Sequence, residues 1–202
     1  MRVFVAIVLF STLTCCSNRS MKADEFARWV ESNKDIVATK TIDNYEFSLK
    51  YLPAAFLALR DLNGKRFTEK DLNSTEENYF SSYNLVFKIV AKDHSKDVIK
   101  EGADSKGAYF SKLQYFISGL QQDVFLADGT DTIRCSLCNF ERTFNLNPYL
   151  TFYLLFDKKG RKNEHFDHDL TLIYNDHILG VGKTYLRIDK TDLNDIPKLK
   201  IP

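Results

Sequence analysis

Short segments in which apolar and polar residues alternate recur along this chain, and they constrain its fold more than any other feature. The clearest is residues 45–52, where every second position is taken by Tyr45, Phe47, Leu49 or Tyr51. Residues 83–91 repeat the pattern. Alternation with a period of two puts one set of side chains on one face of a strand, so each segment predicts a half-buried β-strand.

Further strands are predicted where short apolar runs are bounded by turn residues, at 36–42, 124–127, 130–135, 140–146, 150–156, 170–174 and 184–189. Asp128-Gly129 between two of these runs is typical of a tight hairpin. Because the strands follow one another without regular helices between them, we expect a mostly β chain with a few helices. Its expected form is an antiparallel sandwich, of immunoglobulin-like or other topology, and an α+β fold with one sheet is the alternative.

Three segments are predicted to be helical, namely residues 23–32, 54–62 and 107–121. In the first of them, Phe26, Trp29 and Val30 fall on one apolar stripe. Two further patterns are local. Thr68 with Asp71 resembles a helix cap, and the tail from residue 191 to 202 is predicted to be extended.

The N-terminus has the order of a secretory signal. Arg2 gives a positive start, residues 3–13 are almost entirely apolar, and Leu13-Thr14-Cys15-Cys16 follows. The apolar run is too short to cross a bilayer as a permanent helix. The sequence therefore predicts export of the chain, with the signal removed.

This segment resembles the signals of bacterial lipoproteins, in which a Leu at minus three and small residues precede the cysteine that takes the lipid. The resemblance implies lipidation of Cys16, with Cys15 in place of the usual small residue at minus one. Cleavage before Cys15 and an ordinary secretory signal are the alternatives. Ser17 is not the Asp that retains lipoproteins in the inner membrane, so the resemblance implies an outer-membrane, periplasm-facing protein.

The predicted organisation is a signal over residues 1–15, a lipidated tether over 16–22 and one globular domain over 23–202. Within the domain, a helical or mixed part at 23–121 and an all-β part at 122–202 are conceivable units. The 202 residues include 28 Lys and Arg against 27 Asp and Glu, and Arg2 leaves with the signal. The remaining chain is neutral, which argues against nucleic acid as a partner.

Cys135 and Cys138 form a C-x-x-C motif whose flanks are predicted to be strands. Redox proteins place this motif at a helix N-terminus, and outside the signal segment the sequence has no second cysteine pair for a structural zinc site, so neither function is favoured. In an oxidising envelope the two could form a disulfide across a turn at Ser136-Leu137. Two buried thiols are the equal alternative.

The densest cluster of metal-capable side chains comprises Glu164, His165, Asp167, His168 and Asp169. Imidazoles and carboxylates can hold a divalent ion. The spacing matches no known metalloenzyme motif, however, so a solvated hairpin tip is favoured over a metal site. No cofactor is predicted.

A membrane anchor without a recognisable catalytic motif favours a non-catalytic binding or assembly role, with a protein partner in an envelope complex. Fold class alone would not establish this. Two alternatives remain. One is a metal-dependent or carboxylate-based hydrolase of envelope polymers that uses the 164–169 loop, and the other is a module that binds a glycan or small ligand.

Overall fold

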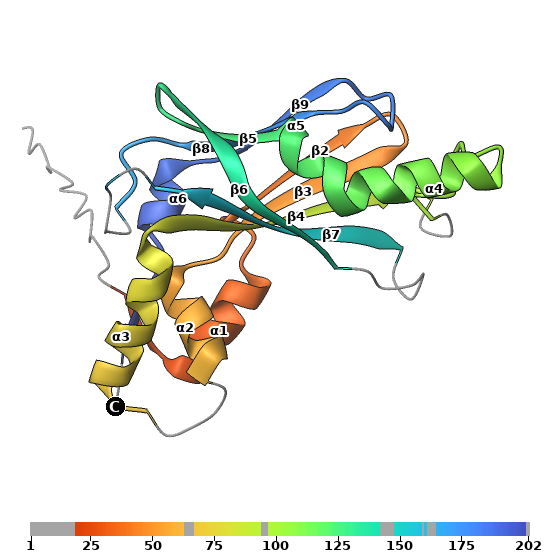
Figure 1. The fold of residues 1–202 in the computed structure, drawn as a ribbon. Coiled ribbons are helices and arrows are strands. Elements are labelled where there is room, and N and C mark those ends of the chain that lie inside the picture. Colours follow the sequence, from red (N-terminus) through yellow and green to blue (C-terminus); the bar gives the residue numbers. More distant parts are fainter. Residues whose placement is uncertain are drawn as a thin grey trace, which may run out of the picture.

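The computed structural model describes residues 19–62, 67–93, 97–141, 148–158, 160 and 165–200. Within these residues, eight strands form one antiparallel sheet in the order β2-β3-β4-β7-β6-β5-β8-β9 (Figure 1). The strands are β2 (Val37–Ile42), β3 (Tyr45–Tyr51), β4 (Ser82–Ala91), β5 (Val124–Asp128), β6 (Asp131–Glu141), β7 (Tyr149–Asp157), β8 (Leu170–Asn175) and β9 (Lys183–Ile188). The prediction of a mostly β fold with a few helices is confirmed.

The sheet curls until its two edges meet. The edge strand β9 contacts the opposite edge strand, β2, and its neighbour β3. The inner face of this nearly closed barrel holds the main core, which includes Phe47, Phe87, Phe116, Phe152 and Tyr174. Aromatic rings stack across it, with the centroids of Phe47 and Phe87 6.2 Å apart. Segments before and after residue 122 share this sheet and core, since β4 pairs with β7.

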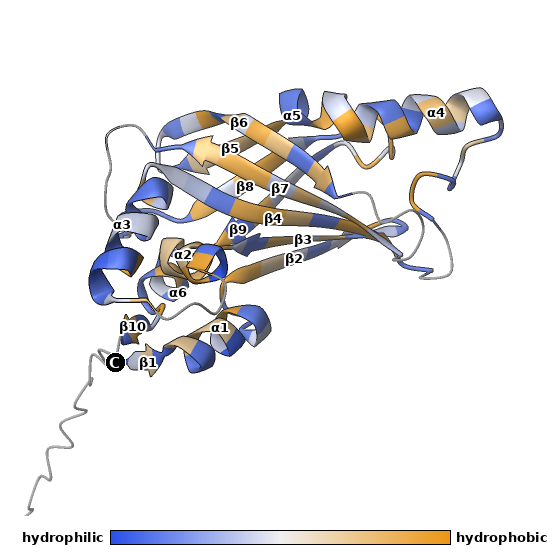
Figure 2. Ribbon diagram, turned by 60° about the horizontal axis from the view of Figure 1, so that its bottom comes forward, coloured by the Kyte–Doolittle hydropathy of each residue, from blue (hydrophilic) through white to orange (hydrophobic). Residues whose placement is uncertain are grey.

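Helices cover part of the outer face of the sheet. They are α1 (Ala23–Ser32), α2 (Ala54–Leu62) and α3 (Glu69–Phe80), which lie together beneath β4 and β7 (Figure 1). A second apolar cluster joins α1 and α2 to the sheet and contains Phe26, Val30, Phe56 and Val86. Figure 2 shows the matching division of hydropathy, with apolar stretches along the strands and mixed polarity along α1.

The local helix predictions are confirmed in this layer. The α1 helix spans the predicted residues, and it buries Phe26 and Val30 while Trp29 packs at the margin of the cluster. Thr68 caps α3, because its side-chain oxygen accepts a hydrogen bond from the Asp71 amide and Asp71 accepts one from the Thr68 amide. Reciprocal bonds of this kind satisfy amides that a helix start leaves free.

The predicted helix at residues 107–121 has three parts in the structure. An α-helix, α4 (Lys106–Gln114), continues into a π-helical turn, η1 (Tyr115–Gly119), and then into α5 (Leu120–Asp123). A Cβ atom on Gly119 would lie 2.7 Å from the Tyr115 ring. Glycine is therefore required here by the close approach of Tyr115, whose hydroxyl donates to Asp123 at 2.8 Å.

The structure corrects three predictions at the ends of elements. Ser20–Lys22, assigned to the tether, form β1, which pairs in parallel with β10 (Lys198–Lys200). The tail is not simply extended, because it begins with the helix α6 (Lys190–Asn194). Segments 130–135 and 140–146 were predicted as separate strands, but β6 is continuous to Glu141, and residues 142–147 lie outside the described residues.

Candidate functional site

A concave site of about 590 Å³ lies between the outer face of the sheet and the helices α1 and α2. We call it the sheet–helix cavity. Its polar lining residues are Glu31, Ser48, Lys50, Arg60, Lys88, Glu141, Tyr149, Thr151 and Tyr153, and its apolar ones are Val30, Val37, Leu52, Phe56 and Val86. Binding pockets for small molecules have this order of volume and combine apolar walls with a few convergent polar groups.

Strand register builds the floor of the cavity. Ser48 on β3 is paired with Lys88 on β4, and Lys88 is paired in turn with Thr151 on β7. Thr151 is then paired with Glu141 on β6. Directly opposite residues in an antiparallel sheet lie on the same face. Polar side chains from strands far apart in sequence therefore form one row on the outer face.

A second row runs beside the first. Lys50 is paired with Val86, and Val86 with Tyr153. Lys50 and Lys88 are thus diagonal neighbours on adjacent strands, close enough for long side chains to interact. Burial lowers the pKa of Lys50 and the charge of Lys88 lowers it further, while the carboxylate of Glu31 acts in the opposite direction.

The three cations among the described residues that line the cavity contact mainly neutral groups. Lys50 donates a hydrogen bond to the backbone carbonyl of Glu31 at 2.8 Å. The Lys88 ammonium lies 4.6 Å from the centre of the Tyr149 ring, and the Arg60 guanidinium lies 5.9 Å from that of Phe56. Contacts with aromatic faces stabilise a cation without neutralising it.

Two further side chains complete the polar lining. Tyr153 donates its hydroxyl to Glu141 at 3.4 Å, and its pKa is raised by burial and by the Glu141 charge, which Arg60 partly offsets. Thr151 is only 2% exposed, and its hydroxyl has no hydrogen-bond partner among the residues that the structure describes. A buried polar atom without a partner is uncommon and marks a position where a ligand or water would be stabilised.

The metal-capable side chains predicted near residues 164–169 do not converge where they are described. Glu164 lies outside the described residues. His168 packs over Gly129 at the β5–β6 turn, whereas His165 lies 3.7 Å from Asp167, and both members of that pair are exposed. In the described part of the chain, no three His, Cys, Asp or Glu side chains are placed to share a metal ion.

The same loop instead fastens α6 to the barrel. Asp169 accepts a hydrogen bond from the Lys190 amide at 2.9 Å and pairs with the Arg187 guanidinium at 2.8 Å. Phe166 is buried, and its backbone amide and carbonyl both bond to the Asn194 side chain. The side chains of His165, Asp167 and His168 are exposed, as expected of a solvated loop, while Phe166 between them is buried and ties the loop to the fold.

The contact between His168 and Gly129 predicts an effect on stability. Gly129 has a positive φ of 64°, and a Cβ atom there would lie 2.5 Å from the His168 ring. We expect Gly129→Ala to lower the free energy of unfolding by about 2 kcal/mol, from backbone strain and displacement of the ring. Urea unfolding measures this.

Gly180→Ala is the matched control for this substitution. Gly180 has a φ of 80°, and no described atom lies within 4 Å of the position that an alanine Cβ would take, so only backbone strain remains. Its loss should be about half as large. If both variants lose the same amount, the contact between Gly129 and His168 does not contribute.

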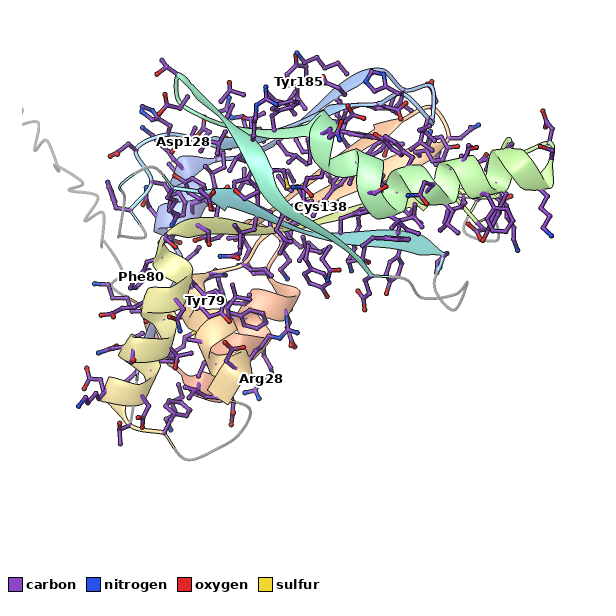
Figure 3. The ribbon with its side chains drawn as sticks, in the orientation of Figure 1. Arg28, Tyr79, Phe80, Asp128, Cys138 and Tyr185 are labelled. Atoms are coloured by element: carbon purple, nitrogen blue, oxygen red, sulfur yellow. The ribbon has the colours of Figure 1, made fainter. Side chains whose placement is uncertain are left out.

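Cys135 and Cys138 lie on β6, where an irregularity in register follows Cys135. Cys135 is paired with Phe156 and Cys138 with Leu154, two residues away on β7, so the bulge turns both cysteines to the same face. Figure 3 shows Cys138 in the middle of the molecule. Both thiols are free, and burial raises the pKa of Cys135 to about 11 and that of Cys138 to about 12. Such thiols are poor nucleophiles at neutral pH.

No protein-family model, curated protein or solved structure matches this chain. The predicted lipidation residue Cys16 lies outside the described residues. Of the helices in the described ranges, none combines the length and the apolar character needed to cross a membrane.

Sequence reasoning did not find the sheet–helix cavity, although two signals were present. Lys88 is the one charged residue of β4, and Thr151 interrupts the apolar run of β7. Each is unusual in a strand that is otherwise apolar. Their adjacency depends on the pairing of β4 with β7, which the sequence does not specify.

Proposed function

We propose that this chain is a lipid-anchored protein of the bacterial cell envelope with a non-catalytic binding role, and that the sheet–helix cavity receives the ligand. The observation that carries the binding role is the cavity itself, about 590 Å³ in volume and lined by both charged and aromatic side chains. Its volume lies within the range of small-molecule sites, and its charged lining favours a polar ligand.

The position of the cavity supports the link between binding and anchoring. Within the described residues, the first strand, β1, begins at Ser20, which is four positions after Cys16 in the sequence, and α1 follows β1 directly. A lipid on Cys16 would hold β1 within about 14 Å of the anchored residue, because an extended residue spans at most about 3.5 Å. Since α1 forms one wall of the cavity, the ligand would be bound on the anchored side of the body.

The anchor has a direct test. Intact-mass measurement of the processed protein should show an acylated N-terminal cysteine, and Cys16→Ala should abolish the acyl adduct and release the chain from the outer membrane. Two or three acyl chains give durable anchoring, since each buried methylene contributes about 0.8 kcal/mol. Cys15→Ala is the control and should leave the acyl mass on Cys16. An unacylated wild-type chain would refute the anchoring.

The binding role is tested with the same material. Native mass spectrometry of the protein, purified from the envelope in mild detergent, should detect a bound small molecule. Ser48→Trp fills the floor of the cavity and should remove it, because Ser48 lies in the central polar row. A bound molecule that persists in this variant, or none in the wild-type protein, would contradict the proposal.

A further inference from the structure

The sheet–helix cavity carries an excess of positive charge. Among the described residues that line it, Lys50, Lys88 and Arg60 face two carboxylates, Glu31 and Glu141. In the described part of the chain, no carboxylate oxygen lies within salt-bridge distance of any of these three cations. Their charges are therefore only partly compensated by the protein.

The positive charges of Lys50 and Lys88 also repel each other. They lie diagonally on β3 and β4 on one face of the sheet, and part of the side chain of Lys50 is buried. Like charges brought together in a partly desolvated site raise the free energy of the protein. Burial is the main cause of the lowered pKa of Lys50, and the charge of Lys88 contributes to it. A negative group between the two ammonium groups would relieve the repulsion.

Thr151 provides a neutral donor beside these charges. It lies directly opposite Lys88, and its buried hydroxyl has no partner among the described residues. Thr151 lines the cavity, and in another staggered χ1 rotamer its hydroxyl would leave its present buried position. An acceptor oxygen there would satisfy it.

We propose that the ligand of the sheet–helix cavity is a small oxyanion, a phosphate- or carboxylate-bearing molecule held by Lys50, Lys88 and Arg60 with the Thr151 hydroxyl. Charge-assisted hydrogen bonds from lysine and arginine are the strong ones for such groups. The volume of about 590 Å³ leaves room beyond the anionic group for the remainder of an organic molecule against Tyr149 and Phe56. This inference rests on the binding role proposed above and names its ligand class.

Isothermal titration calorimetry of the full processed protein in detergent tests the inference. The probes are inorganic phosphate and citrate, with glucose as an uncharged molecule of comparable size to citrate. We expect at least one anion to bind, more weakly at high ionic strength, and glucose not to bind. Binding of phosphate alone or of citrate alone assigns the oxyanion to one of the two chemical classes.

Variants locate the binding. Lys50→Gln combined with Lys88→Gln should weaken anion binding at least tenfold, and Thr151→Val should weaken it severalfold while preserving shape. Lys183→Gln is the matched control, because Lys183 also contacts an aromatic ring, that of Tyr185, but on β9 away from the cavity. It should leave the affinity unchanged.

The outcomes separate the two proposals. Absence of binding by both anions, equal binding of glucose, or an affinity that the double variant leaves unchanged would each overturn the oxyanion assignment. None of these results depends on whether Cys16 carries an acyl group or on whether a small molecule co-purifies with the wild-type protein. The anchored binding role therefore stands or falls on its own experiment.

Discussion

Phe152→Ala is expected to cost the protein about 4 kcal/mol of unfolding free energy, more than any other single substitution proposed for this chain. Phe152 is fully buried on β7, and its ring centroid lies 6.0 Å from that of Phe87, 5.9 Å from that of Phe116 and 5.1 Å from that of Phe140. The ring therefore joins the sheet to the π-helical turn. Truncation removes these contacts and leaves a cavity that close-packed neighbours cannot fill.

Urea unfolding followed by the fluorescence of Trp29, the one tryptophan of the chain, measures this loss. Phe110→Ala provides the control. It is the same substitution at a position outside the core, because Phe110 is 52% exposed on α4. Its effect should stay within about 0.5 kcal/mol. A loss below about 1 kcal/mol for Phe152→Ala would mean that the inner face of the barrel is not packed as described.

Asp176→Ala is expected to lower the free energy of unfolding by about 3 kcal/mol at pH 7. Asp176 is buried after β8, and its carboxylate accepts backbone hydrogen bonds from Ile178 at 3.0 Å, Leu179 at 2.9 Å and Val181 at 2.8 Å, and one from the Tyr174 hydroxyl at 2.9 Å. The substitution leaves buried donors without an acceptor, which costs more than the bonds themselves contribute. Asp195→Ala, at an exposed aspartate, should change little.

The contribution of Asp176 also depends on pH. Burial raises the pKa of this carboxyl group, but the hydrogen bonds from Leu179, Ile178, Val181 and Tyr174 lower it more, so the net pKa lies below its ordinary value of 3.8. A group whose pKa is lowered by folding stabilises the protein above its unfolded pKa, and the stabilisation is lost as the pH falls through the folded value.

We therefore expect the difference in stability between the wild-type protein and Asp176→Asn to be constant from pH 7 to about pH 5, and to shrink below about pH 4. Asparagine keeps the shape and one acceptor oxygen, so this variant isolates the charge. Unfolding free energies at a series of pH values supply the measurement. A difference that grows on acidification would contradict the assignment.

Several elements were predictable because their causes are local. The stripe of Phe26 and Val30 sufficed for α1, and the reciprocal bonds of Thr68 and Asp71 sufficed for the start of α3. The same holds for the alternating strand β3. In each case the interacting residues lie within a few positions of one another, so tertiary contacts reinforce a preference that the segment already has.

Other features were missed because their causes lie elsewhere in the chain. The bulge in β6 is defined by the register of β6 with β7. The π-helical turn accommodates the ring of Tyr115 against Gly119. The loop around Phe166 looked polar, yet Phe166 is buried against Tyr51 and Tyr83. One apolar residue in a polar segment has no periodicity, so nothing in the segment itself indicates burial.

The candidate site shows the same division. The alternation of apolar and polar residues was enough to define which residues of a strand share a face. It therefore placed Ser48 and Lys50 together on the outer face of β3. Their meeting with Lys88 and Thr151 follows only from the strand order β3-β4-β7, in which β7 joins β4 across a long stretch of sequence. Alternation specifies faces but not neighbours, because strand pairing is set by the packing of the whole barrel.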